Sequence, residues 1–319
     1  MPVYPLKNEA PSWQIPSAQV NTELTKFHKK ETPTVQLRSH FQGILEQYTC
    51  AETIYTDGSK TASGVGCSII INGVAHLWTL PPMTSIFTAE QYAILQALKY
   101  CQIESKSNLT LIVSDSLSTL NAMSNRYSRD PLILACLQTL KVLMDGDKRV
   151  VFIWVPGHVG ILGNELADQS ARQAAAATGI DCTIVKAPDL KMKIRQCITE
   201  AWQRQWNNEL TQLRTIKPDV TKWTPNVKMS REEAVRIHRL RLGHTALTHS
   251  YLLSGQGHPN CPSCEARLTA MHIMIECPAL SNLRNSFGLS RDFAENLKKP
   301  DLIKNTISFL KCTGFYWKL

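Results

Sequence analysis

Residues 54–80 read IYTDGSKTASGVGCSIIINGVAHLWTL, and this stretch decides the fold of the first half of the chain. It contains three short apolar runs, over residues 54–57, 64–71 and 74–80. Asn72-Gly73 separates the last two runs, and this dipeptide favours the two-residue turn of a β-hairpin. We therefore expect three antiparallel strands in succession.

The residues that follow alternate between helical and strand patterns. Apolar positions at helical spacing predict helices, and uninterrupted apolar runs predict strands of the kind buried in parallel sheets. The expected elements are helix 88–103, strand 109–113, helices 116–123 and 131–144, strand 149–155 and the alanine-rich helix 163–177, which Gly179 ends. This order indicates an α/β fold, a mixed five-stranded sheet with helices on both faces.

The segments before and after this α/β stretch have different sequence patterns. Residues 1–50 carry scattered prolines and polar residues, with one short helical pattern around Ser39 to Gln47, and indicate a mostly extended leader. The α/β domain then occupies residues 51–180. Residues 186–319 form a second, mainly helical domain. Its expected helices cover 190–213 and the stretch from the capping box Ser230-x-x-Glu233 to Leu242.

Charge is unevenly distributed along the 319 residues, which carry a net charge of +9. The first 185 residues contain 14 Lys and Arg against 15 Asp and Glu, and the remainder contain 21 against 11. A basic half beside a near-neutral half is typical of a protein that binds a polyanion such as nucleic acid. A basic surface that only aids solubility is the alternative.

Composition argues against membrane and secreted proteins. No apolar run approaches the roughly 18 residues that a bilayer span needs, and the first ten residues lack the apolar core of a secretory signal. Ten cysteines, several inside apolar patterns (Cys67, Cys101, Cys136), indicate reduced core residues rather than disulfides. We expect an intracellular protein, nuclear or cytoplasmic, with no membrane partner.

Four acids stand where a fold normally avoids charge. Asp57 and Asp115 each end an apolar strand, and ligands bind at such strand ends in open sheets. Glu90 and Asp168 fall on the apolar faces of their helices. Taken alone, Asp57 in its Asp-Gly pair is more typical of a turn.

A cluster of such acids predicts a metal site. Unpaired carboxylates buried near one another are costly because of desolvation and mutual repulsion, so they call for a cation. Oxygen ligands favour Mg²⁺ or Mn²⁺ over zinc. Two such ions roughly 3.5–4 Å apart can promote hydrolysis of a phosphodiester.

These acids lie in motifs that resemble type I ribonuclease H in order and spacing. The motifs are Ile54-Tyr-Thr-Asp57-Gly-Ser59, Thr88-Ala-Glu90, Val113-Ser-Asp115-Ser116, Trp154-Val-Pro-Gly-His158 and Gly163-Asn164-Glu165-x-Ala167-Asp168. The resemblance implies an enzyme that cuts the RNA strand of an RNA–DNA hybrid. It implies that two metal ions are coordinated by Asp57, Glu90, Asp115 and Asp168.

The resemblance also implies roles for three other residues. His158 would assist proton transfer or product release, whereas composition alone allows a loop-packing residue. Ser59 and Asn164 match positions near the substrate, although Ser59 also suits a turn and Asn164 a helix N-cap. No long basic insertion lies between Met123 and Pro131, so affinity for the hybrid must come from elsewhere, and the basic C-terminal half is the candidate.

The C-terminal half contains a cluster with the spacing of a tetrahedral zinc site, Cys261-x2-Cys264-x7-His272-x4-Cys277. Unrelated cysteines in a helical domain are the alternative, and three further histidines lie close enough in sequence to compete as ligands: His244, His249 and His258. A filled Cys3His site has no open position. One zinc ion there would be structural or would serve nucleic-acid binding.

This motif and the preceding Arg239-Leu-Arg-Leu-Gly-His-Thr stretch resemble the C-terminal region of reverse transcriptase polyproteins from non-LTR retrotransposons, particularly arthropod ones. The sequence has no Tyr-x-Asp-Asp polymerase motif. It therefore resembles a fragment of such a polyprotein, or a free-standing descendant.

Some basic and aromatic residues of this half have two interpretations. Arg236, Arg239 and Arg241 can track phosphates or form a solvated helix face. Trp202 and Trp206 are more typical of a core than of a platform for stacking bases.

Two functions then compete. The first is an active hybrid-specific nuclease with a nucleic-acid-binding tail, and the second is a catalytically inactive, retroelement-derived nucleic-acid-binding protein. A transposase or integrase of related topology is disfavoured, because the Gly-His and Asn-Glu-x-Ala-Asp motifs are not typical of those families.

Overall fold

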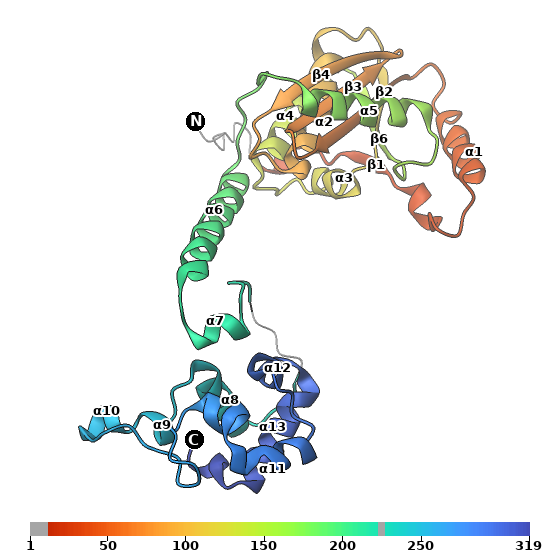
Figure 1. Ribbon diagram of the computed structural model, residues 1–319. Helices are drawn as coiled ribbons and strands as arrows, with labels where there is room; N and C mark the ends of the chain where they lie inside the picture. The colour runs from red at the N-terminus through yellow and green to blue at the C-terminus, as the bar shows by residue number, and fades with distance from the viewer. Residues whose placement is uncertain (1–11, 223–226) are drawn as a thin grey trace. The chain divides into compact units, whose positions relative to one another are not determined.

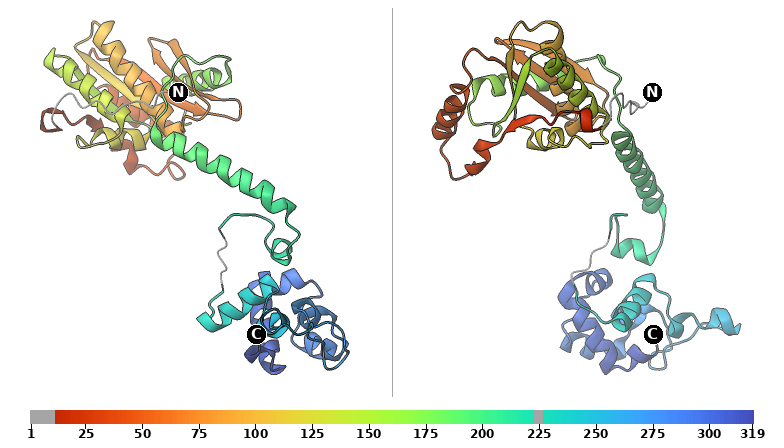
Figure 2. Two further views of the ribbon diagram at one scale, coloured as in Figure 1. Left: turned by 90° about the vertical axis from the view of Figure 1, so that its left-hand side faces the viewer. Right: turned by 180° about the vertical axis from the view of Figure 1, so that it is seen from behind.

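The computed structural model describes residues 12–222 and 227–319, and the chain divides between Ile194 and Arg195 into two units. Within the described residues, the first unit contains a mixed sheet with helices on both faces, as the sequence predicted (Figure 1). The second unit is built mainly from helices (Figure 2).

The first unit follows the predicted order of elements, preceded by a short strand that was not predicted and by a helix that overlaps the helical pattern of residues 39–47. The elements are β1 (Gln19–Asn21), α1 (Thr34–Leu45), β2 (Glu52–Lys60), β3 (Val65–Ile71), β4 (Val74–Leu80), α2 (Ile86–Ile103), β5 (Leu109–Ser114), α3 (Leu117–Met123), α4 (Pro131–Asp145), β6 (Arg149–Trp154) and α5 (Leu162–Ala176). Two short 3-10 turns, η1 (Ser12–Gln14) and η2 (Glu23–Lys26), flank β1.

The strands are ordered β1-β6-β5-β2-β3-β4. β2, β3 and β4 are antiparallel neighbours, and Asn72-Gly73 forms the predicted tight turn with positive φ at both residues. β2, β5 and β6 are parallel, and Thr56 of β2 pairs with Ser114 of β5. The next residues, Asp57 and Asp115, therefore lie at the same edge of the sheet.

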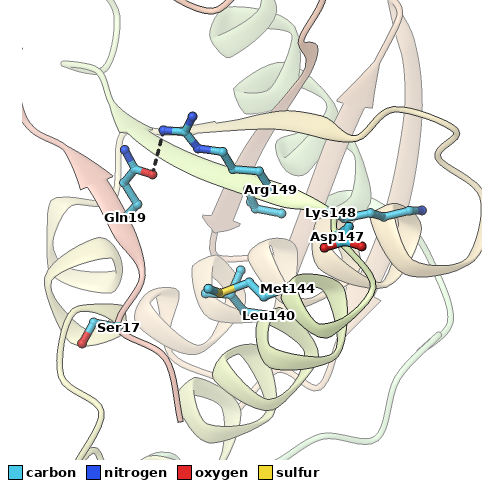
Figure 3. A pocket seen from close by; sticks show the side chains of 8 residues that line it. Ser17, Gln19, Leu140, Met144, Asp147, Lys148 and Arg149 are labelled. Carbon is cyan, nitrogen blue, oxygen red and sulfur yellow. Dashed lines mark hydrogen bonds between the residues drawn. The ribbon is translucent and has the colours of Figure 1, made fainter. Parts of the chain in front are cut away.

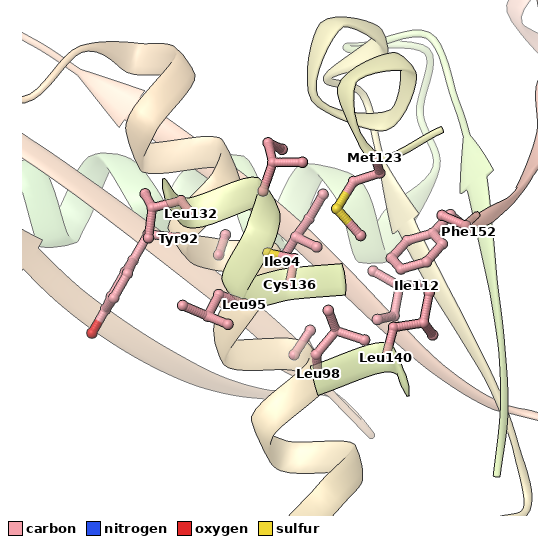
Figure 4. Close-up of a cluster of buried hydrophobic side chains, with 14 of the residues drawn as sticks. Tyr92, Ile94, Leu95, Leu98, Ile112, Met123, Leu132, Cys136, Leu140 and Phe152 are labelled. Carbon is pink, nitrogen blue, oxygen red and sulfur yellow. The ribbon is translucent and has the colours of Figure 1, made fainter. Parts of the chain in front are cut away.

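An apolar core fills one face of the sheet, beneath α2, α3 and α4. Figure 4 shows Ile94 of α2, Cys136 of α4 and Phe152 of β6 within it. Cys67 and Cys101 belong to the same core, and all three thiols are free and buried. This confirms the prediction that these cysteines are reduced core residues.

On the other face, small residues let α5 lie close to β3. A Cβ at Gly66 would stand 2.4 Å from the backbone nitrogen of Ala175, which only a glycine avoids. Ser68 Oγ donates a hydrogen bond to the carbonyl of Ala167 at 2.7 Å. These contacts fix the helix that carries Asp168.

The sheet has six strands within the described part of the chain, so the expectation of five was wrong. The additional strand, β1, pairs in parallel with β6, and Arg149 donates to the side chain of Gln19 at 3.1 Å (Figure 3). A strand of three residues is too short to show a periodicity, which is why its segment suggests an extended leader. α1 follows β1, and its Leu37 and Phe41 are buried against β5 and β6.

The chain after α5 is also fastened to the first unit. Lys186, which is 2% exposed, donates to Gln91 Oε1 at 2.5 Å and to Asp130 Oδ2 at 2.6 Å. Asp189 accepts from the hydroxyl of Thr88 at 2.8 Å. These bonds tie the start of α6 (Ala187–Asn208) to α2 and α4.

Replacing Lys186 with methionine should destabilise the first unit by about 3 kcal/mol, because it leaves the partly buried Asp130 without its cation. Urea unfolding of the full chain, followed by tryptophan fluorescence, measures the change. Lys191→Met, which removes an exposed charge from α6, the helix that follows Lys186, is the control. Equal stability of the two variants would mean that the Lys186 ion pair does not support the fold.

The second unit encloses a separate apolar core. Its elements are α7 (Gln212–Ile216), α8 (Arg231–Leu242), α9 (Ala246–His249), α10 (Tyr251–Ser254), η3 (His272–Glu276), η4 (Pro278–Leu280), α11 (Ser281–Ser286), α12 (Phe293–Lys298), α13 (Pro300–Cys312) and η5 (Phe315–Trp317). The capping box of Ser230 and Glu233 begins α8 as predicted. The helix expected over 190–213 is two helices instead, because Thr211 caps the start of α7. None of the described helices is both long and apolar enough to span a bilayer.

Candidate functional site

Three of the predicted acids converge at the end of β5, where its pairing with β2 stops. Asp57 lies on β2, Glu90 on α2 and Asp115 directly after β5, and one oxygen of each lies within 4.8 Å of the others. Asp57 is 4% exposed and Glu90 7% exposed. The structure thus holds three carboxylates together in a largely buried position.

Two glycines permit this close approach. A Cβ at Gly58 would lie 2.7 Å from the backbone nitrogen of Glu90, so β2 can meet α2 only through a glycine. A Cβ at Gly157 would lie 2.4 Å from Asp115 Oδ2. The backbone of the loop after β6 therefore passes directly against the Asp115 carboxylate.

Arg172 and His158 compensate the charge of the three carboxylates only in part. Burial, reinforced by the charges of Asp115 and Asp168, raises the pKa of Asp57 to about 8. Burial, with repulsion from Asp57, raises the pKa of Glu90 well above its usual value. Glu90 Oε2 is buried and accepts no hydrogen bond. An unpartnered oxygen among clustered acids is an arrangement that a divalent cation satisfies, so these residues could hold a metal ion.

Asp168 lies beside this triplet, in a second group of potential ligands. This group consists of His158, Glu165 and Asp168, and Asp168 Oδ2 lies 3.7 Å from His158 Nδ1. The same oxygen lies 2.8 Å from Arg172 Nη2. The negative charge of Asp168 still helps to raise the pKa of Asp57. The structure therefore places the fourth acid next to the other three, with its carboxylate turned to a histidine and an arginine.

His158 is exposed on the loop between β6 and α5. Its side chain is 59% exposed, and its backbone has a φ of 55°, which is uncommon for a residue with a side chain. The neighbouring Val159 and Ile161 are buried, so they anchor the loop, and His158 is not a packing residue. Its imidazole is free to meet a substrate at the edge of the acid cluster.

Ser59 and Asn164 both lie close to the acids in the chain's fold. Ser59 is in β2 and not in a turn, and it is 8% exposed. Asn164 is 2% exposed and hydrogen-bonds the Asp115 carboxylate, while its own Oδ1 has no partner. Asn164 is not a helix cap, because α5 begins at Leu162 with Ile161 in the N-cap position.

Glu165 and Arg172 were not singled out by the sequence. Glu165 Oε1 accepts from the backbone nitrogen of Gly160 at 3.0 Å and so braces the His158 loop. Arg172 lies one helical turn after Asp168. That i, i+4 spacing is a usable signal for the ion pair, but nothing in the sequence indicates which loop the α5 side chains meet.

The predicted zinc ligands also come together, in the second unit. The Sγ atoms of Cys261 and Cys277 are 3.9 Å apart, and Cys264 Sγ is 3.2 Å from His272 Nε2. Ligands about 2.0–2.3 Å from a tetrahedral zinc are separated by roughly 3.3–3.8 Å, so the four residues fit this ion. A bridge between Asn260 and Arg267 closes the loop that carries the first two cysteines.

The competing histidines are engaged with one another. The rings of His244 and His249 stack with centroids 4.0 Å apart, and His258 packs against Tyr251. Neither arrangement joins the group formed by the three cysteines and His272.

The three arginines around α8 bind backbone carbonyls of the second unit. Arg236 donates to Tyr316 and Arg239 to Leu319, which holds the end of the chain against α8. Arg241, 2% exposed, donates two hydrogen bonds to Leu297 at the end of α12. Arg241 therefore neither contacts phosphates nor forms part of a solvated face. Arg236 and Arg239 are likewise bound to backbone carbonyls of the second unit.

The two tryptophans of α6 are not core residues. Trp202 is 55% exposed, and Trp206 donates to the carbonyl of Lys217 at 2.8 Å. Both line an open apolar pocket with Leu213 and Val220. The expectation of a core position was wrong, because the turn after α7 covers only Trp206.

A further pocket lies at the edge of the sheet and contains none of the predicted site residues. Its lining comes from β1, the end of α4 and the start of β6, and it includes Gln19, Met144 and Arg149 (Figure 3). This pocket is therefore separate from the acid cluster.

Comparison with known proteins agrees with the geometry of the first unit. The sequence model of the RNase H family matches residues 49–176. The Pol polyprotein of Equine infectious anemia virus (strain Wyoming) is 32% identical over 138 residues, which cover 40% of this chain and 11% of that polyprotein. The Pol polyproteins of isolates 1369 and CL22 give the same values. This chain thus spans about a tenth of the length of the curated relatives it matches.

The family match begins before β2 and ends with α5. It includes the predicted acids and His158, and it leaves out β1, α1 and the whole second unit. The likeness of this chain to the RNase H family therefore lies within the first unit, over residues 49–176.

Proposed function

We propose that this chain hydrolyses the RNA strand of RNA–DNA hybrids. The observation that carries the proposal is the meeting of Asp57, Glu90 and Asp115 at one buried point, with a Glu90 oxygen that nothing in the protein satisfies. The match of residues 49–176 to the RNase H family supports the choice of reaction and substrate.

Asp57, Glu90, Asp115 and Asp168 are proposed to hold two Mg²⁺ or Mn²⁺ ions. All four offer oxygen atoms only, which suits these hard cations. When bound, the ions supply the positive charge that favours hydroxide over water and stabilises the departing oxygen of the phosphodiester. The glycines at 58 and 157 keep the carboxylates close enough to share such ions.

His158 is proposed to exchange protons with the substrate or product. It stands at the edge of the cluster, largely exposed, and 3.7 Å from Asp168. Because Asp168 also binds Arg172, its carboxylate can orient the imidazole while its own charge is partly neutralised. Asn164 fixes the Asp115 carboxylate by a hydrogen bond.

The second unit is proposed to carry one structural zinc ion and to add affinity for nucleic acid. The four ligands leave no open coordination position, so this zinc would take no part in hydrolysis. Residues 186–319 have 21 basic against 11 acidic side chains. Descent from a non-LTR retrotransposon polyprotein is proposed on the motifs of this half.

The test is a cleavage assay with the full chain on a hybrid whose RNA strand is end-labelled. We expect shorter RNA fragments in Mg²⁺, an intact DNA strand, and no cutting of double-stranded DNA, because recognition of RNA rests on its 2′-hydroxyl groups. Binding of the hybrid without any cutting would instead support the rival function, an inactive nucleic-acid-binding protein.

A further inference from the structure

The segment before the family match packs directly against the loop that carries His158. Leu24 of η2 and Leu37, Phe41 and Ile44 of α1 form an apolar core with β5 and β6. Val159 and Ile161, which flank the exposed end of the loop, are buried in the same core. The apolar anchors of the loop therefore rest on residues 24–44, outside the domain as the family match defines it.

A polar contact joins the same two segments at the acid cluster. Lys29 Nζ donates to the carbonyl of Gly157 at 2.5 Å, across 128 positions of sequence. Gly157 is the residue whose backbone lies against the Asp115 carboxylate. Lys29 thus holds the loop at the residue between the acid cluster and His158.

The other end of the loop has a neighbour from the same segment. The Arg38 side chain, from α1, lies 3.5 Å from the position that a Cβ at Gly160 would take. Gly160 and His158 both have positive φ, at 79° and 55°. A glycine adopts this conformation at no cost, whereas a histidine keeps it only where its surroundings hold it there.

We propose that Lys29 is a positioning residue, which keeps the Gly157–Gly160 loop in place and so holds His158 beside Asp168. The inference rests on the proposed function of the first unit and extends it to residues 24–44. Lys29 is exposed, so the contact adds little to global stability. The contact orders the loop locally, and its loss lowers the rate of reaction.

The experiment compares Lys29→Met with two matched variants of the full chain. Lys29→Arg keeps a donor for the Gly157 carbonyl, and Lys30→Met removes the same charge from the next residue, which is also exposed. Steady-state cleavage of a labelled hybrid gives kcat and KM for each. Hydrogen–deuterium exchange of a peptide covering residues 156–161 reports the order of the loop without any need for activity.

We expect Lys29→Met to lower kcat about tenfold, since small displacements of a reacting group have effects of this order or larger. Its KM should stay near the wild-type value, its loop amides should exchange faster, and Lys29→Arg should restore both properties. Lys30→Met should behave as wild type. A raised KM with unchanged kcat would overturn the proposal, because it would make Lys29 a substrate-binding charge.

Unchanged exchange in Lys29→Met would also overturn the proposal. If the wild-type chain cuts no hybrid, the proposed function fails on its own, and the exchange of the 156–161 peptide still decides whether Lys29 orders the loop.

Discussion

Replacing Asp57 with asparagine should reduce hybrid cleavage by at least about a thousandfold. Asparagine keeps the shape of the side chain but removes the negative charge from the most crowded point of the cluster, where Glu90 and Asp115 also lie. A cation that neutralises and is held by these carboxylates would then bind poorly. Single-turnover cleavage rates of both proteins, at the Mg²⁺ concentration that just saturates the wild-type chain, measure the loss.

The control for this variant is Asp145→Asn. Asp145 is an exposed carboxylate of the same unit, paired with Lys141 at the surface. Its replacement should leave the cleavage rate within about twofold of wild type, because exposed ion pairs contribute little. Comparable loss in both variants would point to a general effect of charge and against the acid cluster.

The same Asp57→Asn change should stabilise the metal-free protein. Burial, with repulsion from Asp115 and Asp168, raises the pKa of Asp57 to about 8 from an ordinary 3.8. The folded chain therefore binds more protons than the unfolded chain between these values, and its stability falls as the pH rises from about 4 to about 8. Asparagine does not ionise, so the variant does not lose this stability.

The gain in unfolding free energy of Asp57→Asn over wild type should be near zero at about pH 4 and largest at about pH 9. We expect at least about 1 kcal/mol there, which corresponds to a rise of roughly 2–4 °C in Tm. Thermal melts in chelator over this pH range provide the measurement. A variant that is less stable than wild type at high pH would show that the ionised Asp57 carboxylate does not destabilise the metal-free fold.

Replacing Cys261 and Cys277 together with serine should remove the zinc and unfold the second unit. Both thiols are buried in its core, 6% and 1% exposed. Structural zinc contributes of order 10 kcal/mol to the folding of small domains, far more than a helical unit of this size can lose. Elemental analysis should find about one zinc per wild-type chain and none in the variant.

Limited proteolysis locates the damage in this variant. The second unit should become sensitive to protease while residues 12–194 stay resistant, since the two units have separate cores. Cys312→Ser, which removes an exposed thiol of the same unit, is the control. Unchanged metal content in the double variant would show that Cys261 and Cys277 do not bind zinc.

Local patterns predicted most of the first unit. The hairpin at Asn72-Gly73, the uninterrupted run of β5 and the apolar stripe of α2 each have one dominant interpretation, and all three elements formed as expected. β1 was not predicted, and α1 was indicated only by the short helical pattern of residues 39–47, because their stability comes from pairing with β6 and packing on β5, which are far away in the sequence.

The acids were identifiable for a similar reason, since a carboxylate on an apolar face conflicts with its surroundings. The finer arrangement was not. Asp168 turns toward His158 and Arg172, and Lys29 reaches the His158 loop from 128 residues away. The partners of the α8 arginines could not be predicted either. A basic helix face has the same sequence pattern whether it binds phosphates or the carbonyls of its own chain.

Titration of Mg²⁺ into the purified wild-type chain with a labelled hybrid shows whether the clustered carboxylates form a metal-dependent centre for cutting RNA. We expect no RNA fragments in excess chelator and a cleavage rate that rises with Mg²⁺ until it saturates. Cutting that continues at full rate without divalent cations would contradict this expectation.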